Sequence, residues 1–170
     1  MAGSDFVFNI ARGKVGYYYY AVKQNLAVTA AGTPPLTSTA NSALVVVLLE
    51  TTSIEADSTL RDYDDLATLL AGTSNEQTNQ ARKVLTDSDL ASVPAPDDTN
   101  DRFELDIPDQ TYTALGGNPI GKVLICFDND TTGGSDSNIV PLTAHAVSIT
   151  PDGVNNVVLQ IASTGFYRSA

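Results

Sequence analysis

The sequence predicts a β-rich α+β domain, and three of its features carry that prediction. Short apolar segments recur along the chain, and several alternate apolar with polar residues, as a strand with one wet face does. Clusters of Gly, Pro, Asn and Asp separate these segments, as is typical of turns between strands. Helical spacing is clear in one stretch. We therefore expect a single antiparallel domain over residues 1–170, sandwich-like or barrel-like, with one main helix at about residues 59–71 and an irregular arm.

The first third of the chain contains two ambiguous segments. Residues 6–10 alternate well enough to form a short strand or an extended N-terminal segment. The run from Tyr17 to Tyr20 fits a helix or a strand, but four successive tyrosines would point almost all around a helix and aromatic residues favour strands, so a strand is expected. Residues 27–42 contain Pro34 and Pro35, which predicts a mobile loop or arm.

The middle of the chain contains the expected core strand and the expected helix. Residues 43–49 are apolar without alternation, which indicates a strand buried on both faces. The helix over residues 59–71 is predicted from the spacing of Leu60, Tyr63, Leu66, Ala67 and Leu70. Asp57 or Ser58 is expected to cap its start, and Gly72 to end it in the left-handed conformation. Thr86 and Asp89 predict a short helical turn at residues 86–91.

The last third is predicted to be largely β. Phe103, Leu105 and Ile107 alternate with acidic residues, and Pro108 ends that strand. Further strands are expected at residues 111–115, 122–127, 139–149 and 157–166. The turns between them are marked by glycine-rich or proline-rich clusters at residues 116–119, 133–136 and 151–153.

The charge balance disfavours two classes of partner. Twenty acidic against nine basic residues give a net charge of −11, and no local basic patch is visible, so a nucleic-acid partner is not expected. The longest apolar run, residues 43–49, is too short to span a bilayer, and the N-terminus lacks the basic and apolar regions of a signal peptide. The expectation is a soluble protein made in the cytoplasm with no membrane partner.

Few residues could carry catalysis. His145 is the only histidine, and in a strand over residues 139–149 it shares a face with Thr143, Val147 and Ile149, so a structural role is expected. Cys126 lies within an apolar run and is expected to be a buried structural thiol. No nucleophile-elbow motif is present. The sequence therefore predicts a protein that is not an enzyme, with no catalytic residue and no cofactor.

The acidic and glycine-rich clusters are also interpreted as structural features and not as sites. The pairs Asp64–Asp65 and Asp97–Asp98 are interpreted as solvated charge rather than as paired catalytic carboxylates. Gly116–Gly117 lacks the glycine spacing and the lysine of a phosphate loop.

The loop from Asp128 to Asp136 resembles the start of a calcium loop. It departs from the EF-hand pattern at Thr132 and at Ile139, which stands where the closing Glu belongs. We expect a structural loop that binds calcium weakly or not at all, and no metal site.

Several stretches together resemble a family of small virion proteins of tailed bacteriophages. They lie at residues 9–15, 41–49, 60–66, 82–87, 94–102, 106–111, 139–143 and 165–168, and so cover most of the chain. The tyrosine run departs from the more polar segment expected there. The resemblance brings no catalytic or ligand residues with it.

The resemblance implies a non-enzymatic structural protein of the virion. The preferred role is decoration of the capsid surface, with the major capsid protein as partner and a homo-oligomer, possibly a trimer, as the assembling unit. Exposed tyrosines among Tyr17 to Tyr20 and the arm at residues 27–42 are expected to provide contacts. A tail or head–tail connector component is one alternative, and a carbohydrate-binding or adhesive β domain is another.

Overall fold

A five-stranded antiparallel sheet forms the centre of the molecule. The computed structural model describes residues 3–27, 37–38 and 41–169. The strands lie in the order β1-β9-β8-β4-β5. They are β1 (Phe6–Val7), β4 (Ala43–Glu50), β5 (Lys83–Leu85), β8 (Ile120–Asp128) and β9 (Ile139–Ile149). The sheet stays open, with β1 and β5 at its edges among the described strands, so it closes no barrel.

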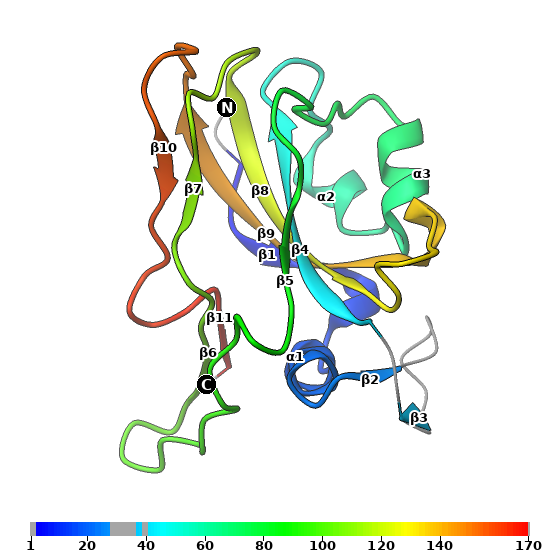
Figure 1. Cartoon of the computed structure of the whole chain (residues 1–170), viewed down its shortest axis with the longest axis vertical. Helices are drawn as coiled ribbons and strands as arrows, with labels where there is room; N and C mark the ends of the chain where they lie inside the picture. The colour runs from blue at the N-terminus through cyan, green and yellow to red at the C-terminus, as the bar shows by residue number, and fades with distance from the viewer. Residues whose placement is uncertain (1–2, 28–36, 39–40, 170) are drawn as a thin grey trace.

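Both faces of the sheet are covered. Figure 1 shows two short helices on one side of it and a two-stranded ribbon on the other, with the longest helix below. These elements are α2 (Asp57–Leu60) and α3 (Leu66–Ala71), then β7 (Gln110–Tyr112) and β10 (Val157–Leu159), and α1 (Val15–Lys23). A second ribbon pairs β6 (Phe103–Leu105) with β11 (Tyr167–Ser169). The expected β-rich α+β fold is confirmed.

The predicted core strand is also confirmed. Within β4, the residues from Ala43 to Leu49 are all buried, because the sheet has packed layers on both sides. Leu44 pairs with Phe127 of β8, and a ring from α1, that of Tyr18, lies 4.7 Å from the Phe127 ring. The apolar run therefore lies in the interior, where lack of alternation is what burial on both faces requires.

The expected helix at residues 59–71 is wrong as a continuous element. The structure has α2 and α3 instead, separated by residues 61–65. Asp65 is extended (φ −145°) and its carboxylate accepts a hydrogen bond from the Thr68 N–H, so it starts a new helix where the pattern predicted a helix interior. Aspartate is unfavourable in the interior of a helix and favourable at its N-cap, and here Asp65 acts as the N-cap. The helical spacing of the leucines continues across this break.

The expected caps of that helix differ as well. The N-cap of α2 is Ala56, with no side-chain hydrogen bond, and not Asp57 or Ser58. Asp57 instead turns towards Lys122 of the sheet. Gly72 ends α3 with φ −71°, outside the left-handed region.

The expected strand at the tyrosine run is wrong, because these residues form α1. Tyr18 and Tyr19 are buried, and the hydroxyl of Tyr19 donates to the Ala91 and Asp106 carbonyl oxygens. Tyr17 is half-buried and Tyr20 is 42% exposed. Packing of one helical face against the sheet outweighs the modest β preference of aromatic residues.

The remaining expected strands are mostly present. The strand at residues 139–149 is confirmed as β9, and β6, β7 and β8 overlap the other expected segments within a few residues. The segment 157–166 instead divides into β10 and a turn before β11. β10 ends at Leu159, and Gly165 lies between it and β11 with φ +77°, where a side chain would collide with the Leu105 carbonyl.

Shorter elements complete the chain. The expected strand at residues 6–10 is β1 followed by a 3-10 helix, η1 (Asn9–Ala11). Within the expected arm at residues 27–42, β3 (Thr37–Ser38) pairs with β2 (Leu26–Ala27), whereas Pro34 and Pro35 lie outside the described residues. The Asp89 carboxylate accepts from the Thr86 N–H as expected, but the Asp89 N–H donates to the Thr86 carbonyl and not to its hydroxyl, and these residues form a turn rather than a helix.

Candidate functional site

His145 lies in a chain of three polar side chains at the edge of the sheet. Its Nε2 is 2.9 Å from the Thr143 hydroxyl, and its Nδ1 is 3.5 Å from a carboxylate oxygen of Asp5. Burial lowers the pKa of His145, although Asp5 acts in the opposite direction, so the neutral ring is favoured near pH 7. The order carboxylate, imidazole, hydroxyl is that of a nucleophilic triad, but Thr143 is only 2% exposed. Its hydroxyl cannot meet a substrate in this arrangement.

A cavity of about 460 Å³ lies beside His145, between the β8–β9 face of the sheet and the segment that follows β10. Its walls are mainly apolar, and Asp5 and His145 are its ionisable side chains. The apolar lining side chains include Val123, Ile125, Val147, Ile149, Val158 and Phe166. Of the residues predicted to share a face, His145, Val147 and Ile149 line this cavity, whereas Thr143 is buried and does not line it. We still predict that truncating His145 affects stability more than any activity.

A second hollow, a groove of about 880 Å³, lies between the N-terminal segment, α2 and β9. Its lining is rich in hydroxyl groups, from Ser4, Thr51, Ser53, Ser58 and Ser148. Glu55 and Asp57 add carboxylates. Val147 and Ser148 of β9 line both this groove and the apolar cavity.

Lys122 is a buried cation at the base of this groove. It is 2% exposed, and its ammonium nitrogen lies 2.9 Å from an Asp57 carboxylate oxygen and donates to the Ser4 carbonyl at 3.2 Å. Burial acts to raise the pKa of Asp57, but hydrogen bonds from Ser4 and Lys122 outweigh it, and the pKa lies below its usual value. The pair thus ties α2 and the N-terminal segment to the sheet.

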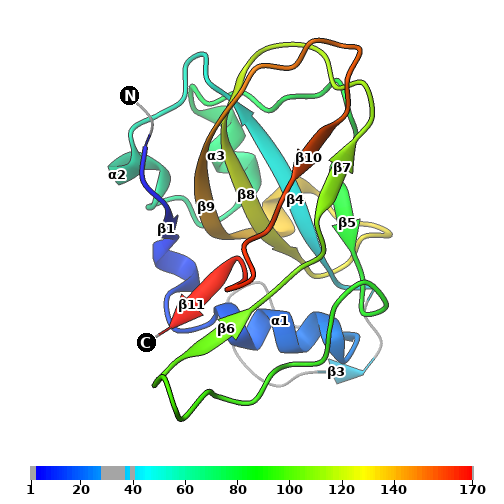
Figure 2. The same ribbon diagram turned by 90° about the vertical axis from the view of Figure 1, so that its left-hand side faces the viewer.

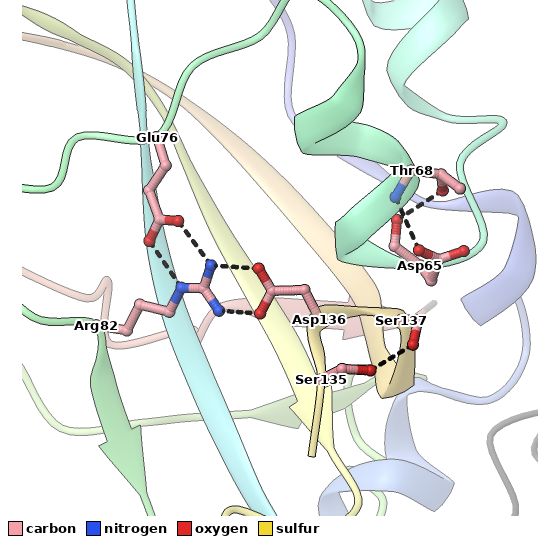
Figure 3. Close-up of polar contacts among 7 residues, drawn as sticks. All are labelled: Asp65, Thr68, Glu76, Arg82, Ser135, Asp136 and Ser137. Atoms are coloured by element: carbon pink, nitrogen blue, oxygen red, sulfur yellow. Dashed lines mark hydrogen bonds and ion pairs between the residues drawn. The ribbon is translucent and has the colours of Figure 1, made fainter.

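Arg82 is the second internal cation, and Figure 3 shows it between two carboxylates. Its guanidinium donates two hydrogen bonds to Glu76, at 2.6 and 2.7 Å, and two to Asp136, at 2.6 and 2.9 Å. The hydrogen bonds from Arg82 lower the pKa of Asp136, and both carboxylates raise that of Arg82. We call Glu76, Arg82 and Asp136 the Arg82 cluster. It joins the β4–β5 connection to the loop before β9.

The calcium-like loop is held together by its own hydrogen bonds. Asp128 accepts from the Asp130 N–H, Asp130 accepts from Thr132, and Asp136 belongs to the Arg82 cluster. Burial raises the pKa of Asp128. No group of three or more metal-ligating side chains occurs within residues 3–27, 37–38 and 41–169. Weak or absent calcium binding remains a prediction, to be tested by melting with and without calcium.

The other singled-out residues do not converge on a site. Cys126 is fully buried, as predicted, and burial raises the pKa of its thiol. Asp65 caps α3, whereas Asp97 accepts hydrogen bonds from Thr99 and Asn100 within its own turn. Gly117, with φ +91°, forms part of the turn that leads into β8.

Most of the nine basic residues contact internal partners. They form ion pairs, lie over aromatic rings or donate to backbone carbonyls; this set is Lys23, Arg61, Arg82, Lys83, Arg102, Lys122 and Arg168. Many of the twenty acidic residues instead lie on the surface, among them Asp64, Asp98 and Asp101. The outer surface of the described chain is therefore dominated by carboxylates.

Sequence reasoning missed Asp5, Lys122 and Arg82 as organising residues. A lysine within the apolar run of β8 is a usable signal, because an unpaired buried ammonium is costly and requires a partner. Arg82 carries no such signal, since its carboxylates are six and fifty-four residues away. Within the described residues, no helix is long and apolar enough to cross a membrane.

Comparison of the chain with protein-family models, curated proteins and solved structures finds no match.

Proposed function

We propose that this chain is a non-enzymatic structural protein of a tailed-phage virion, with decoration of the capsid surface as its role. The proposal rests on the sequence resemblance, and one structural observation carries it further. Most basic side chains contact partners within the chain, while many carboxylates are exposed. Such a surface repels packaged nucleic acid and limits nonspecific aggregation before assembly, and it suits a protein partner with complementary charge.

The proposed partner is the major capsid protein, and the proposed location is the outer surface of the virion. Tyr20 is the member of the tyrosine run that is available for a contact between subunits, because it is 42% exposed while Tyr18 and Tyr19 are buried. Tyrosine suits such a position, since it buries a large area and keeps a polar tip. A trimer is the proposed assembling unit, because capsid lattices offer threefold positions.

The experiment is a count of copies in purified virions. The expected result is a copy number comparable to that of the capsid subunit, with surface labelling that reaches the protein in intact particles. Native mass spectrometry of the free protein tests the trimer, and Tyr20→Ser tests its contact. About a dozen copies or fewer would instead indicate a tail or head–tail connector component. Absence from virions would contradict the proposal.

The groove lined by hydroxyl groups supports the alternative of a carbohydrate-binding domain. Serine and threonine hydroxyls beside Glu55 and Asp57 can hydrogen-bond sugar hydroxyls, although no aromatic ring lines the groove. Glycan-array binding that is lost in Glu55→Gln but kept in the exposed control Asp64→Asn would favour this function over decoration.

A further inference from the structure

The outer edge of β9 is only partly occupied. β1 pairs with Thr143 and Ala144, and the carboxylate of Asp5 accepts the hydrogen bond of the Ala146 N–H at 2.8 Å. Beyond Ala146, no described strand pairs with the outer edge of Val147, Ser148 and Ile149. Figure 2 shows β1 beside the lower part of β9 and the upper part at the margin of the sheet. Unpaired strand edges are templates for an added strand.

The two hollows lie on opposite sides of this unpaired edge. Val147 and Ser148 line both, the apolar cavity on the side of β10 and the hydroxyl-lined groove on the side of α2. Successive side chains of a strand point to opposite faces of a sheet. The register of β9 against β8 shifts between Ala146 and Ile149, where Val147 and Ser148 border both hollows. The side chains of an extended segment laid along this edge would alternate between the cavity and the groove.

The lining of each hollow specifies the side chains it accepts. The cavity presents Val123, Ile125 and Phe166 inside, and Val158 at 48% exposure, which suits an aliphatic side chain. The groove presents hydroxyls and the carboxylate of Glu55, while Asp57 is paired with Lys122, which suits threonine or a lysine directed at Glu55. We propose that β9 binds an extended polypeptide segment in which aliphatic residues alternate with threonine or lysine.

Charge decides between a partner and a second copy of this chain. Asp5 lies at the cavity and is 67% exposed, and Glu55 lines the groove, where Asp57 is already paired with Lys122, so this edge favours a basic segment over a segment from another copy of this acidic chain. The occupant is therefore a segment of a different protein with basic character. This inference deepens the proposed function, and it rests on that function only for the source of the segment.

The test uses the full-length protein and a synthetic peptide, acetyl-Thr-Val-Lys-Val-Thr-amide. Backbone amide shifts are followed by NMR during titration, with the reordered acetyl-Thr-Thr-Lys-Val-Val-amide as the peptide control. The expected shifts are confined to residues 53–58, 146–149 and 158–162, and the reordered peptide binds at least about tenfold more weakly because it loses one buried valine.

Two matched variants locate the site. Val158→Asp places a charge at the cavity and should weaken binding at least about tenfold. Val84→Asp is the control, because Val84 is 46% exposed and lies on β5 at the opposite edge of the sheet. It should leave binding unchanged. The thermal unfolding of both variants is measured first. If a variant is unstable, the amide shifts of the unmodified protein still locate the binding site.

Four results would overturn the inference. These are no shifts at about 1 mM peptide, shifts at β5 that Val84→Asp removes, the same shifts on raising protein concentration alone, and binding of a small apolar probe such as cyclohexanol without binding of the peptide. The proposed function fails separately, through absence from virions. Peptide binding by a protein absent from virions would keep the inference and reject the function, and the reverse pair of results would do the opposite.

Discussion

Lys122 and Arg82 are both cations that hold distant segments together, yet they do so in different surroundings. Lys122 is 2% exposed, and its partners are a single carboxylate, a carbonyl oxygen and the face of the Phe6 ring at 5.2 Å. The Arg82 side chain is 25% exposed and donates four hydrogen bonds to two carboxylates. The difference follows from their shapes. An ammonium is a point charge that fits a closed site, whereas a planar guanidinium can bind two carboxylates side by side.

The largest expected effect comes from removing the partner of the buried cation. Asp57→Ala leaves the ammonium of Lys122 buried without a carboxylate, and this should lower the free energy of unfolding by about 3 kcal/mol. Urea denaturation measures it. The control is Asp64→Ala, an exposed aspartate next to α3, which should change stability by less than about 0.5 kcal/mol. Equal stability of the two variants would show that Lys122 does not depend on Asp57.

The second effect concerns the geometry of the Arg82 cluster. Arg82→Met removes all four hydrogen bonds and leaves two carboxylates facing each other, so the free energy of unfolding should fall by about 2 kcal/mol. Arg82→Lys keeps the positive charge but lacks the planar guanidinium that binds two carboxylates. Its free energy of unfolding should fall by about half as much. If Arg82→Lys were as stable as the unmodified protein, charge alone would explain the cluster.

Acid should weaken both cation sites. The folded-state pKa values of Asp57 and Asp136 are lowered from the usual 3.8, so each stabilises the fold above that pH and ceases to do so as the pH falls through its folded pKa. Stability should therefore decline as the pH drops below about 4. Denaturation curves at successive pH values measure this, and Asp57→Asn and Asp136→Asn should each flatten the decline. A decline with the same slope in both variants would assign it to other carboxylates, such as Asp97 or Asp152.

Salt should produce the smallest effect and separate the two sites. Partly exposed ion pairs are screened by salt, while buried ones are screened much less. Raising sodium chloride from about 0.05 to about 1 M should reduce the cost of Arg82→Met by about 0.5 kcal/mol and leave that of Asp57→Ala unchanged. Denaturation by urea at each salt concentration makes the comparison, because urea adds no ions. An equal reduction in both variants would mean that Lys122 is also solvated.

The contrast between α1 and β9 shows where sequence reasoning succeeds. The strand β9 was predicted at its observed bounds, since β-branched residues followed a clear turn cluster. The tyrosine run was predicted to be a strand, yet Tyr18 packs on Phe127 and Tyr19 donates to two backbone carbonyls. Both contacts join residues far apart in the sequence, so local preference could not indicate them. The helix expected at residues 59–71 failed for a local reason, because Asp65 caps rather than continues a helix.

The sequence by itself determined the β-rich class, the buried β4 strand, the buried Cys126 and the face that His145 shares with Val147 and Ile149. Each follows from residue type and short-range periodicity, which act between near neighbours. Only the tertiary structure decided that Asp5 lies beside His145, that Lys122 meets Asp57, and that Arg82 joins Glu76 to Asp136. It also placed two hollows of opposite character along one unpaired edge. Such arrangements depend on which strands pair and on how layers pack, and a single chain records neither in its local pattern.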